Sequence, residues 1–286
     1  MQRWAGLVQR TLCRMNGFDL ERPEHAYMFG FIQADGHLSQ GPGRKGRLTV
    51  ELSARDAPLL EEFQRLCPYN STISYRTRST NFATEHTSVL WTVCALEFRE
   101  RLQALGLPSG RKSLNIAPPT VAYSERDYIR GIIDADGSVG RTAQDLPFVG
   151  VTTASEALVR YYCDYTERLT GRARTARRNT RDNIYNILLT REEAMTLTQV
   201  LYYPGCLALP RKQAAADDVG NWVRPVGMKR MHRKEWTAEE TELLLATPDP
   251  EEAARLLNRS VKSCQTRRWR LIGPKKARVR FPHTPA

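Results

Sequence analysis

The chain has 286 residues and carries 43 lysines and arginines against 31 aspartates and glutamates, so its formal net charge is +12. This length exceeds one average domain, and a balance this basic favours a polyanionic partner over charge that serves solubility alone. No apolar run approaches the roughly 18 residues that a membrane-spanning helix needs, so nucleic acid is a better partner than a membrane. The six cysteines and five histidines are scattered, which excludes a zinc finger or a disulfide framework and indicates free thiols in a reducing compartment.

Residues 1–22 read as a basic N-terminal extension, because Arg3, Arg10 and Arg14 precede the first acid, Asp19. Apolar residues between these arginines predict a weak amphipathic helix, a composition that an organelle transit peptide shares. The segment runs into the next element without an evident cleavage signal. We therefore expect an extension that touches nucleic acid or packs on the body of the protein.

Two stretches of the chain repeat each other: residues 27–36 read YMFGFIQADG and residues 128–137 read YIRGIIDADG. Gly30 and Gly131 are 101 residues apart, and so are Asp35 and Asp136. This constant offset indicates an internal duplication, which predicts two pseudo-symmetric repeats over residues 23–122 and 123–216. Each stretch is apolar on all sides and ends in glycine, so we predict a short buried helix with the glycine at its C′ position.

Small residues in both stretches predict that the two helices pack against each other. Gly30 with Ala34, and Gly131 with Ala135, lie four residues apart on one helix face and permit a close approach. The last acid of each stretch would then lie beside the other, at the negative end of a helix dipole. Two close carboxylates repel each other and raise one pKa, and a divalent cation with oxygen ligands relieves this most directly. The alternative is that both acids are ordinary residues at helix C-termini.

Each of these helices is followed by the same predicted order of elements. After the first, we predict strands over residues 37–40 and 43–53, a helix over 56–67, strands over 72–78 and 88–95, and a helix over 96–105. After the second, we predict strands over 138–141 and 148–153, a helix over 155–169, strands over 172–178 and 184–190, and a helix over 191–202. The chain is thus an α+β protein with two αββαββα repeats. A Leu-Pro pair shortly before Lys112 and again before Lys212 supports the duplication independently.

Arginines dominate the predicted strands of both repeats. A two-stranded ribbon fits the DNA major groove, and alternate side chains of a strand point into it. Arginine can pair with guanine through two hydrogen bonds or contact phosphates. Most single arginines on a strand are merely solvated, but their recurrence in both repeats predicts DNA contacts. The candidates are Arg44, Lys45, Arg47, Arg76, Arg78, Arg141, Arg172, Arg174, Arg177, Arg178 and Arg181.

From residue 217 to 234 the composition shifts to glycine, proline and basic residues, which predicts a linker before a separate helical module at 235–273 and a basic tail at 274–286. Thr237 with Glu240 predicts a capping box, Asp249 before a proline predicts a second helix start, and Ser260 begins a third helix over residues 261–271. The predicted core of the module is Trp236, Leu243, Leu244, Ala253, Ala254, Leu256, Leu257, Val261, Trp269 and Leu271.

This module resembles a Myb/SANT-like helix-turn-helix, through WTAEE at residues 236–240 and LNRS at residues 257–260. The resemblance implies that the third helix enters the major groove. The residues that would face DNA are Lys262, Gln265, Thr266, Arg268 and Arg270. The alternative is a capping bundle with a basic surface.

The duplicated stretches resemble the motifs of LAGLIDADG homing endonucleases, specifically the single-chain, two-motif kind; IRGIIDADG matches closely and MFGFIQADG more loosely. The resemblance implies a pair of αββαββα units whose four-stranded sheets form a saddle over double-stranded DNA. It also implies a site that binds Mg²⁺, for which Mn²⁺ can substitute. The metal site would comprise Asp35, Asp136, Gly36 and Gly137, and the catalytic residues would be Asp35, Asp136, Lys112 and Lys212.

One motif position departs from the family pattern. Gln33 replaces the usual first acid, which Asp134 keeps in the second motif. The resemblance implies that this position is less critical to the chemistry. We therefore expect asymmetry between the two halves of the site rather than loss of activity.

The function implied by the resemblance is that of a monomeric, site-specific homing endonuclease, which makes a metal-dependent double-strand break in a long DNA target, as in intron homing. One alternative is a non-catalytic transcription regulator on the same scaffold, and another is an intron maturase with intron RNA as its partner. Retention of both last acids favours cleavage, because regulators of this type typically lose them. The expected location is the cytoplasm for a prokaryotic or phage-encoded protein, with an organelle as the alternative.

Overall fold

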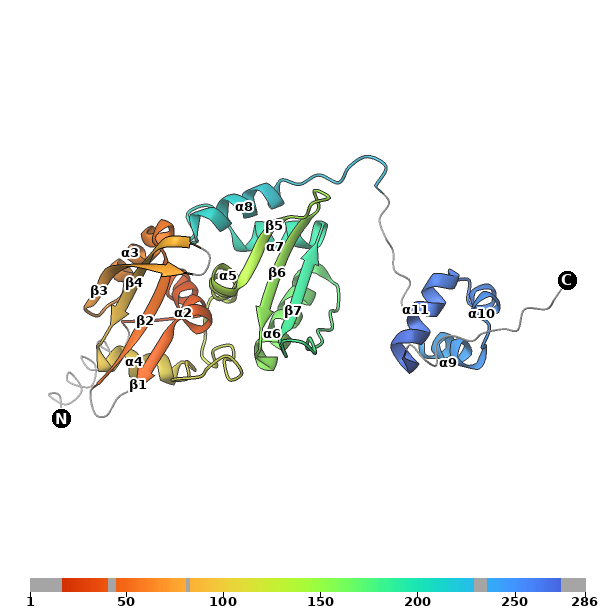
Figure 1. The fold of residues 1–286 in the computed structure, drawn as a ribbon, viewed down its shortest axis with the longest axis horizontal. Coiled ribbons are helices and arrows are strands. Elements are labelled where there is room, and N and C mark those ends of the chain that lie inside the picture. The colour runs from red at the N-terminus through yellow and green to blue at the C-terminus, as the bar shows by residue number, and fades with distance from the viewer. Residues whose placement is uncertain (1–16, 41–44, 81–82, 229–235, 274–286) are drawn as a thin grey trace, which may run out of the picture. The chain divides into compact units, whose positions relative to one another are not determined.

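The structure is a computed structural model that describes residues 17–40, 45–80, 83–228 and 236–273 (Figure 1). Contacts between Cα atoms divide the chain into unit 1, Met1–Arg224, and unit 2, Pro225–Ala286, and each unit is described by itself. The predictions for residues 1–16, for Arg44 and for the basic tail at 274–286 lie outside the described residues. Within the described ranges, no helix is long and apolar enough to cross a membrane.

The first repeat has the predicted order of elements. Its sheet is antiparallel with the strand order β1-β2-β4-β3. On β2, Leu48 and Val50 are fully buried, so alternate side chains place one face of the strand on the core. The elements are α2 (Pro23–Asp35), β1 (His37–Gln40), β2 (Gly46–Ser53), the short 3₁₀ helix η1 (Ala54–Asp56), α3 (Ala57–Leu66), β3 (Ser71–Thr80), β4 (Ala83–Val93) and α4 (Leu96–Ala104).

The second repeat differs by one strand. Its described sheet has three strands in the order β5-β6-β7, and the strand predicted over residues 172–178 is wrong: only an isolated bridge joins Arg178 to Tyr185. This segment reads RARTARR and offers no large apolar row to bury, whereas alternate residues of β7 are buried. The elements are α5 (Glu125–Asp136), β5 (Gly137–Arg141), β6 (Pro147–Thr153), α6 (Glu156–Thr170), β7 (Tyr185–Thr190) and α7 (Glu192–Leu201).

A further helix, α8 (Pro210–Gly220), follows the second repeat. It occupies the start of the segment predicted as a linker from residue 217. Val219 on this helix is fully buried, and Trp222 just beyond it is only 4% exposed. The linker therefore begins later than its composition indicated, because the alanine-rich sequence before Val219 favours a helix that packs on α7.

The two duplicated helices, α2 and α5, pack directly against each other between the two sheets (Figure 1). A Cβ atom built on Gly30 would lie 2.2 Å from the carbonyl oxygen of Tyr128, and one built on Gly131 would lie 2.2 Å from that of Tyr27. Any side chain larger than hydrogen would therefore force the helices apart. The predicted packing is confirmed, with one glycine of each helix at the crossing.

The glycines that end these helices are needed for space and not for an unusual backbone conformation. Gly36 and Gly137 have φ angles of −70° and −102°, so neither adopts the left-handed conformation typical of a C′ glycine. A Cβ on Gly36 would lie 2.6 Å from the Ile32 carbonyl oxygen, and one on Gly137 would lie 2.7 Å from that of Ile133. The chain turns tightly from each helix into its first strand, and only glycine fits there.

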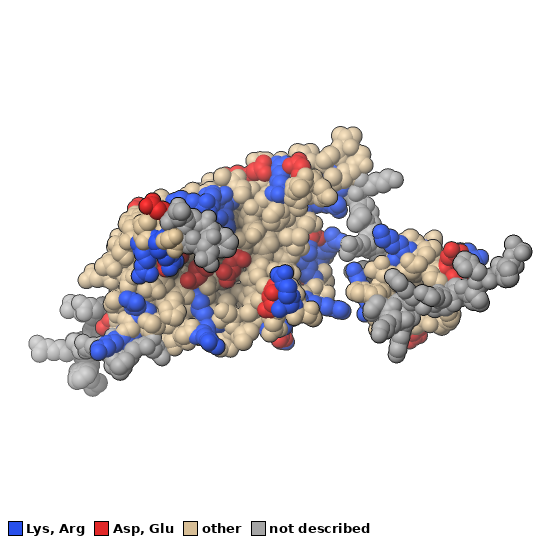
Figure 2. All heavy atoms as spheres, in the orientation of Figure 1, with Lys and Arg blue, Asp and Glu red and all other residues tan. Residues whose placement is uncertain are grey.

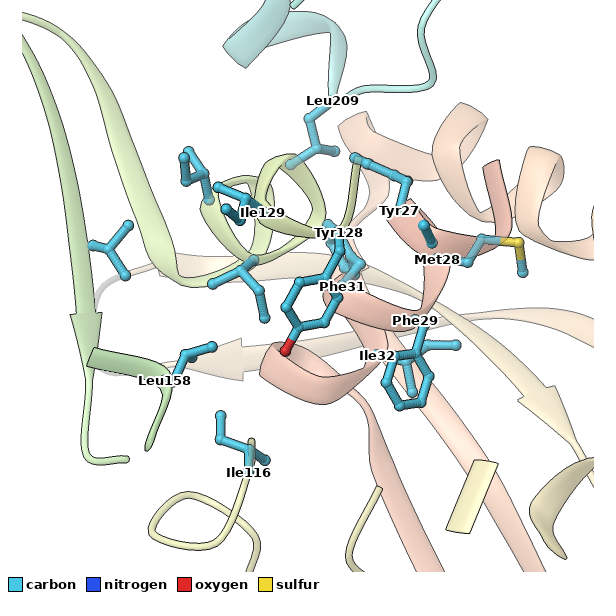
Figure 3. Packing of buried hydrophobic residues seen from close by; sticks show 14 of the residues in the cluster. Tyr27, Met28, Phe29, Phe31, Ile32, Ile116, Tyr128, Ile129, Leu158 and Leu209 are labelled. Carbon is cyan, nitrogen blue, oxygen red and sulfur yellow. The ribbon is translucent and has the colours of Figure 1, made fainter. Parts of the chain in front are cut away.

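The crossing helices are the centre of one continuous apolar core. Tyr27, Phe29 and Phe31 of α2 and Tyr128 of α5 are fully buried, and Leu158 of α6 belongs to the same cluster (Figure 3). Every residue of α2 from His25 to Gln33 is buried. The two repeats therefore fold as one body around these helices.

Charged residues of α5 lie inside this core, contrary to the prediction of a helix that is apolar on all sides. Arg130 of α5 is 1% exposed, forms an ion pair with Asp127 at 2.5 Å, and donates hydrogen bonds to the carbonyl oxygens of Leu201 and Leu207. A buried charge is tolerated only when it is paired and hydrogen-bonded in this way. Arg130 thus ties α5 to the end of α7.

Unit 2 contains three described helices, α9 (Ala238–Ala246), α10 (Pro250–Leu256) and α11 (Val261–Ile272). The capping box of Thr237 and Glu240 is confirmed, and Asp249 and Ser260 accept hydrogen bonds at the starts of the other two helices. Its core is smaller than predicted: it contains Leu244, Ala253, Ala254, Leu257 and Cys264, with Trp236 packed against it.

Five of the residues predicted for this core are exposed. Their exposed fractions range from 37% to 58%. A bundle of three short helices buries only a narrow stripe of each one, and on α11 this stripe is Cys264 and Arg268, four residues apart. The wrongly predicted core residues are Leu243, Leu256, Val261, Trp269 and Leu271.

Candidate active site

The last acids of the two duplicated stretches, Asp35 and Asp136, end α2 and α5 and are exposed to solvent. Protein surrounds both carboxylates closely enough that burial raises the pKa of each. For Asp136, the negative charge of Asp35 adds to this, and the pKa reaches about 6. The predicted repulsion between the two acids is thus present, and it falls mainly on Asp136.

Lys112 and Lys212 lie at the C-terminal ends of the same two helices. The Nζ atom of Lys112 donates to the carbonyl oxygen of Ile32 at 2.9 Å. The Nζ atom of Lys212 donates to the carbonyl oxygens of Ile133 and Asp134 in the last turn of α5, both at 2.6 Å. The carbonyl oxygens of Ile32 and Ile133 also accept from the N–H groups of Gly36 and Gly137. Each lysine therefore adds a positive charge at the last turn of its helix, which offsets the negative end of the helix dipole.

Burial lowers the pKa of each lysine to about 8, while the nearby carboxylates oppose this shift. For Lys112 the opposing groups are Asp136 and then Asp35. The ammonium groups thus lie close enough to both acids to feel their negative charge, while their hydrogen bonds go to main-chain carbonyl groups. The catalytic role expected for both lysines stays a prediction.

Gln33 and Asp134 lie one turn before the glycines and hold the helix crossing together. Tyr128 of α5 donates its hydroxyl to Gln33 Oε1 at 2.5 Å, and Tyr27 of α2 donates to Asp134 Oδ2 at 2.7 Å. Both residues are buried. The two tyrosines open the duplicated stretches, so their recurrence 101 residues apart was a signal for these bonds in the sequence, but their partners were not predicted.

The remaining partners explain why one repeat has an amide and the other a carboxylate. Gln33 Nε2 donates to the carbonyl oxygens of Gly106 and Ala117, at 3.2 and 3.0 Å. Asp134 instead accepts from the Tyr202 hydroxyl at 2.6 Å and from the Leu209 N–H at 2.7 Å. An amide can satisfy two acceptors, and a carboxylate can satisfy only donors. The departure at Gln33 is therefore explained by its buried partners, and it lies two residues before the exposed acid Asp35.

The donor set of the two last acids fits a divalent cation. No described residue donates a hydrogen bond to the carboxylate of Asp35 or Asp136, in contrast to the three donors around Asp134. Carboxylate oxygens are the ligands that Mg²⁺ prefers, and Mg²⁺ usually keeps several waters and binds substrate phosphates through one or two carboxylates. Within the described residues no three acidic, histidine or cysteine side chains gather as a metal site, so water and phosphate oxygens would complete the coordination. Gly137, predicted in the metal site, has its carbonyl oxygen bound by Lys212 at 2.9 Å.

Arg211 was not predicted for the site, yet its charge influences the carboxyl group of Asp35. Its Nε lies 3.3 Å from Asp56 Oδ2 at the start of α3, so it connects the second repeat to the first. Its positive charge also lowers the pKa of Asp35, after the larger effects of the two lysines. Asp35 therefore has one more positive neighbour than Asp136. Adjacency to Lys212 was the only sign of this in the sequence.

The candidate DNA contacts of the first repeat are on or near its sheet. Lys45, Arg47, Arg76 and Arg78 are exposed, and Arg78 pairs with Glu51 at 3.0 Å. Figure 2 shows lysines and arginines interspersed with acidic side chains on the face of unit 1 in view. These side chains remain candidates for DNA contacts.

The arginines of the second repeat lie mostly beside its sheet. Arg141 points to the helical side and binds Asp218 of α8 and Asp145. Arg172 and Arg174 pair with Glu193 at the start of α7. The remaining side chains sit in the segment between α6 and β7: Arg178 lies over the Tyr185 ring, Arg181 pairs with Asp182, and Arg177 is exposed.

In unit 2, one predicted DNA contact is a structural residue. Arg268 is 3% exposed, and its guanidinium donates to the carbonyl oxygens of Leu244, Thr247 and Pro248. It closes the C-terminal end of α9 and cannot face DNA at the same time. Lys262, Gln265, Thr266 and Arg270 are exposed.

Comparison with known proteins finds one similar domain family and similar folds. A family model described as a LAGLIDADG-like domain matches residues 124–199. The structure of the homing endonuclease I-WcaI bound to its DNA recognition sequence matches with a TM-score of 0.50 and 11% identity, over 69% of this chain and 87% of that chain. A search of curated proteins found no match.

Two more structures match less well. Mesophilic variants of the homing endonuclease I-DmoI give a TM-score of 0.47 at 16% identity, over 70% of this chain and 99% of that chain. The LAGLIDADG homing endonuclease I-GzeII in complex with its DNA target gives 0.43 at 12% identity, over 70% and 88%. Residues 124–199 of the second repeat are therefore similar to a LAGLIDADG-like domain, and the chain shares its fold with the I-WcaI structure.

Proposed function

We propose that this protein is a site-specific DNA endonuclease that hydrolyses one phosphodiester bond on each strand of a duplex and requires a divalent cation. The observation that carries the proposal is the pair of exposed carboxylates, Asp35 and Asp136, at the ends of two helices that cross in contact. Neither has a hydrogen-bond donor among the described residues. Two such acids, one from each repeat, supply one ligand for each strand of DNA.

The resident cation would be Mg²⁺, with Mn²⁺ as a substitute, held by Asp35 and Asp136. When bound, it would lower the pKa of a water molecule and stabilise the leaving oxygen. The raised pKa of Asp136, about 6, supports this role, because a cation relieves the repulsion that disfavours its ionised form.

Lys112 and Lys212 keep the two acids in place. Their ammonium groups hold the last carbonyl groups of α2 and α5, so the helix ends cannot fray while phosphate approaches. Their positive charge is also within reach of the charge that develops on phosphate oxygens in the transition state. Both carboxylates come from one chain, and we therefore propose that a monomer contains a complete site.

Unit 2 is proposed to bind DNA as a helix-turn-helix through the exposed side chains Lys262, Gln265 and Arg270. Residues 228–286 carry 14 basic and 7 acidic residues, and so supply +7 of the net charge of +12. Each phosphate contact lowers log Kobs by about 0.9 per tenfold rise in salt. Deleting residues 225–286 should therefore weaken DNA binding and reduce its salt dependence.

The experiment starts by selecting bound duplexes from a randomised library, so that the target is known before cleavage is tested. A supercoiled plasmid that carries the selected sequence is then incubated with Mg²⁺, with Mn²⁺ and without a cation. We expect linear product only with a cation. Asp35→Asn and Asp136→Asn, which keep the side-chain volume but remove a ligand, should bind without cutting, and Asp145→Asn, at an exposed turn, should cut normally.

Linear product from either active-site variant at the wild-type rate would remove that acid from the mechanism. Binding by the wild type without any cleavage would favour the alternative function, a non-catalytic DNA-binding regulator. Preference for structured intron RNA over duplex DNA in the same assay would favour a maturase.

A further inference from the structure

The solvent faces of the two sheets differ in chemistry at equivalent positions. The offset of 101 residues aligns β5 with β1, and strand pairing extends the alignment to the neighbouring strands. Ser39 pairs with Arg47 in the first repeat, and Gly140 pairs with Phe148 in the second. Further along, Thr49 pairs with Thr92, and Gly150 pairs with Leu188. Phe148 thus occupies the position of Arg47, and Leu188 occupies that of Thr92.

Phe148 and Leu188 lie on the solvent face of neighbouring strands, and each is paired with a glycine. A Cβ on Gly140 would lie 3.7 Å from Cε1 of the Phe148 ring, and one on Gly150 would lie 3.4 Å from Cδ1 of Leu188. Each apolar side chain therefore leans over a glycine instead of projecting outward. We call Phe148, Leu188, Gly140 and Gly150 the apolar patch.

The apolar patch is not part of the core. The strand neighbours of its members, Val149, Val151 and Ile187, are 0 to 5% exposed and point to the other face of the sheet. Leu188 is 53% exposed and Phe148 is half-buried. Burial in the fold thus explains the inward residues of β6 and β7 but not these two.

Positive charge and the catalytic acid flank the patch. Arg174 donates a hydrogen bond to the Leu188 carbonyl oxygen at 3.2 Å, and Arg177 is exposed in the same segment beside β7. β5 begins directly after Asp136, so Gly140 lies four residues beyond the acid, roughly 13 Å along the strand. If the scissile phosphate of a bound DNA lies at Asp136, the bases that face the patch lie about four base pairs away from it.

We propose that the apolar patch recognises the 5-methyl groups of thymine in the half of the target bound by the second repeat. In the major groove only thymine presents a methyl group, and apolar side chains are the groups that contact it. The described strands β5, β6 and β7 carry no charged side chain on this solvent face, so the bidentate guanine contact open to Arg47 in the first repeat has no counterpart here. The proposal rests on the proposed function for its DNA partner.

The test replaces thymine by uracil, which lacks only the methyl group, one position at a time in each half of the selected duplex. Binding is measured without a divalent cation, so that cleavage does not interfere. In the half bound by the second repeat, uracil at patch positions should weaken wild-type binding about four-fold per methyl group, the factor expected for one CH₂-sized group returned to water. In the other half, the change should stay below about two-fold.

The Arg47→Ala variant identifies the half of the target that the first repeat binds, because it should relax base preference there alone.

Leu188→Thr, which installs the residue found at the equivalent position of the first repeat, should bind thymine and uracil duplexes equally. Its fold should be unaffected because the side chain is half exposed, and thermal unfolding checks this. Thr92→Val is the matched control in the first repeat and should keep the uracil effect of the second half. Phe148→Ser should also reduce the effect.

A selected half-site without thymine at these positions would overturn the proposal, as would a uracil effect that persists in Leu188→Thr. Self-association of the wild type that Leu188→Thr abolishes would assign the patch to a second copy of the chain instead. Because the target is selected by binding, absence of cleavage would count against the proposed nuclease but not against thymine recognition. Cleavage at the same rate with thymine and with uracil would count only against thymine recognition.

Discussion

The two repeats of unit 1 share a backbone plan but use different chemistry to hold it. At the crossing, Gln33 gives two hydrogen bonds to carbonyl groups, whereas Asp134 accepts from three donors. At the helix ends, Lys112 binds one carbonyl group and Lys212 binds three. A duplicated fold therefore conserves the places where backbones meet and leaves the polar partners at each place free to diverge, provided that every buried group is satisfied.

The largest effect on stability should come from substituting the glycines at the helix crossing, which is the feature that both repeats share. Gly30→Ala and Gly131→Ala each place a Cβ 2.2 Å from a carbonyl oxygen of the other helix. We expect each to lower the free energy of unfolding by roughly 3 to 5 kcal/mol, because two backbones and not a flexible side chain must move. Gly140→Ala, where the nearest atom is 3.7 Å away, is the control and should cost little. Urea unfolding followed by circular dichroism measures all three, and equal stability of the crossing variants and the control would contradict the symmetric close contact.

A smaller effect should come from exchanging the polar chemistry of the two repeats. Asp134→Asn turns an amide N–H₂ toward donors, and Gln33→Glu turns a carboxylate toward two carbonyl groups, so each should destabilise unit 1 by about 2 to 4 kcal/mol. Asp145→Asn, at an exposed carboxylate, should change stability by less than about 0.5 kcal/mol. Thermal and denaturant unfolding report the changes. Tolerance of both exchanges would mean that the buried partners do not determine which residue each repeat carries.

The two arginines at the end of α11 offer a comparison within unit 2. Arg268→Ala should unfold this unit, at a cost of about 2 to 3 kcal/mol, because three carbonyl groups lose their donor. Arg270→Ala should leave unit 2 folded and reduce the salt slope of DNA binding by about one. Helix content of the full chain on heating and binding isotherms at several salt concentrations distinguish the two. The assignment of Arg268 to structure fails if its variant loses DNA affinity but keeps the melting profile.

The smallest effect concerns the unequal acids. The pKa of Asp136 is raised from 3.8 to about 6, so the folded, metal-free protein loses stability as pH rises from about 4 to 6 and regains none above it. Asp136→Asn removes this loss and should stabilise the metal-free protein above pH 6 by about 1 kcal/mol, a value reduced for solvent screening of an exposed carboxylate. The gain should shrink as pH falls toward 4, because the folded wild-type carboxyl group is then protonated and the unfolded one, with a pKa of 3.8, is becoming so.

Asp35→Asn should stabilise less, because Arg211 together with the two lysines favours the ionised form of Asp35. Unfolding curves of wild type and both variants with a chelator, from pH 4 to pH 8, provide the measurement. A larger gain for Asp35→Asn than for Asp136→Asn would reverse the inequality between the two acids.

The sequence by itself determined the features that depend on local pattern and on the duplication. The constant offset predicted the pairing of α2 with α5 and the placement of an acid at each helix end, because glycine spacing on a helix face is a local property. The capping box predicted the start of α9. The strand predicted over residues 172–178 failed because alternating polarity alone cannot make a strand without an apolar row to bury.

Only the tertiary structure decided which polar groups meet. Gln33 and Asp134 are equivalent in the motif, and their different partners come from loops and helices 68 to 84 residues away in the chain. Arg268 was predicted to face DNA, yet its guanidinium binds main-chain carbonyl groups at a helix end. Lys212 was predicted as catalytic, and its ammonium group also binds carbonyl groups at a helix end. A basic side chain has the same sequence signature whether it faces phosphate or a helix terminus, because both present negative charge. Which of the two it meets depends on packing between distant segments, and no local pattern records that.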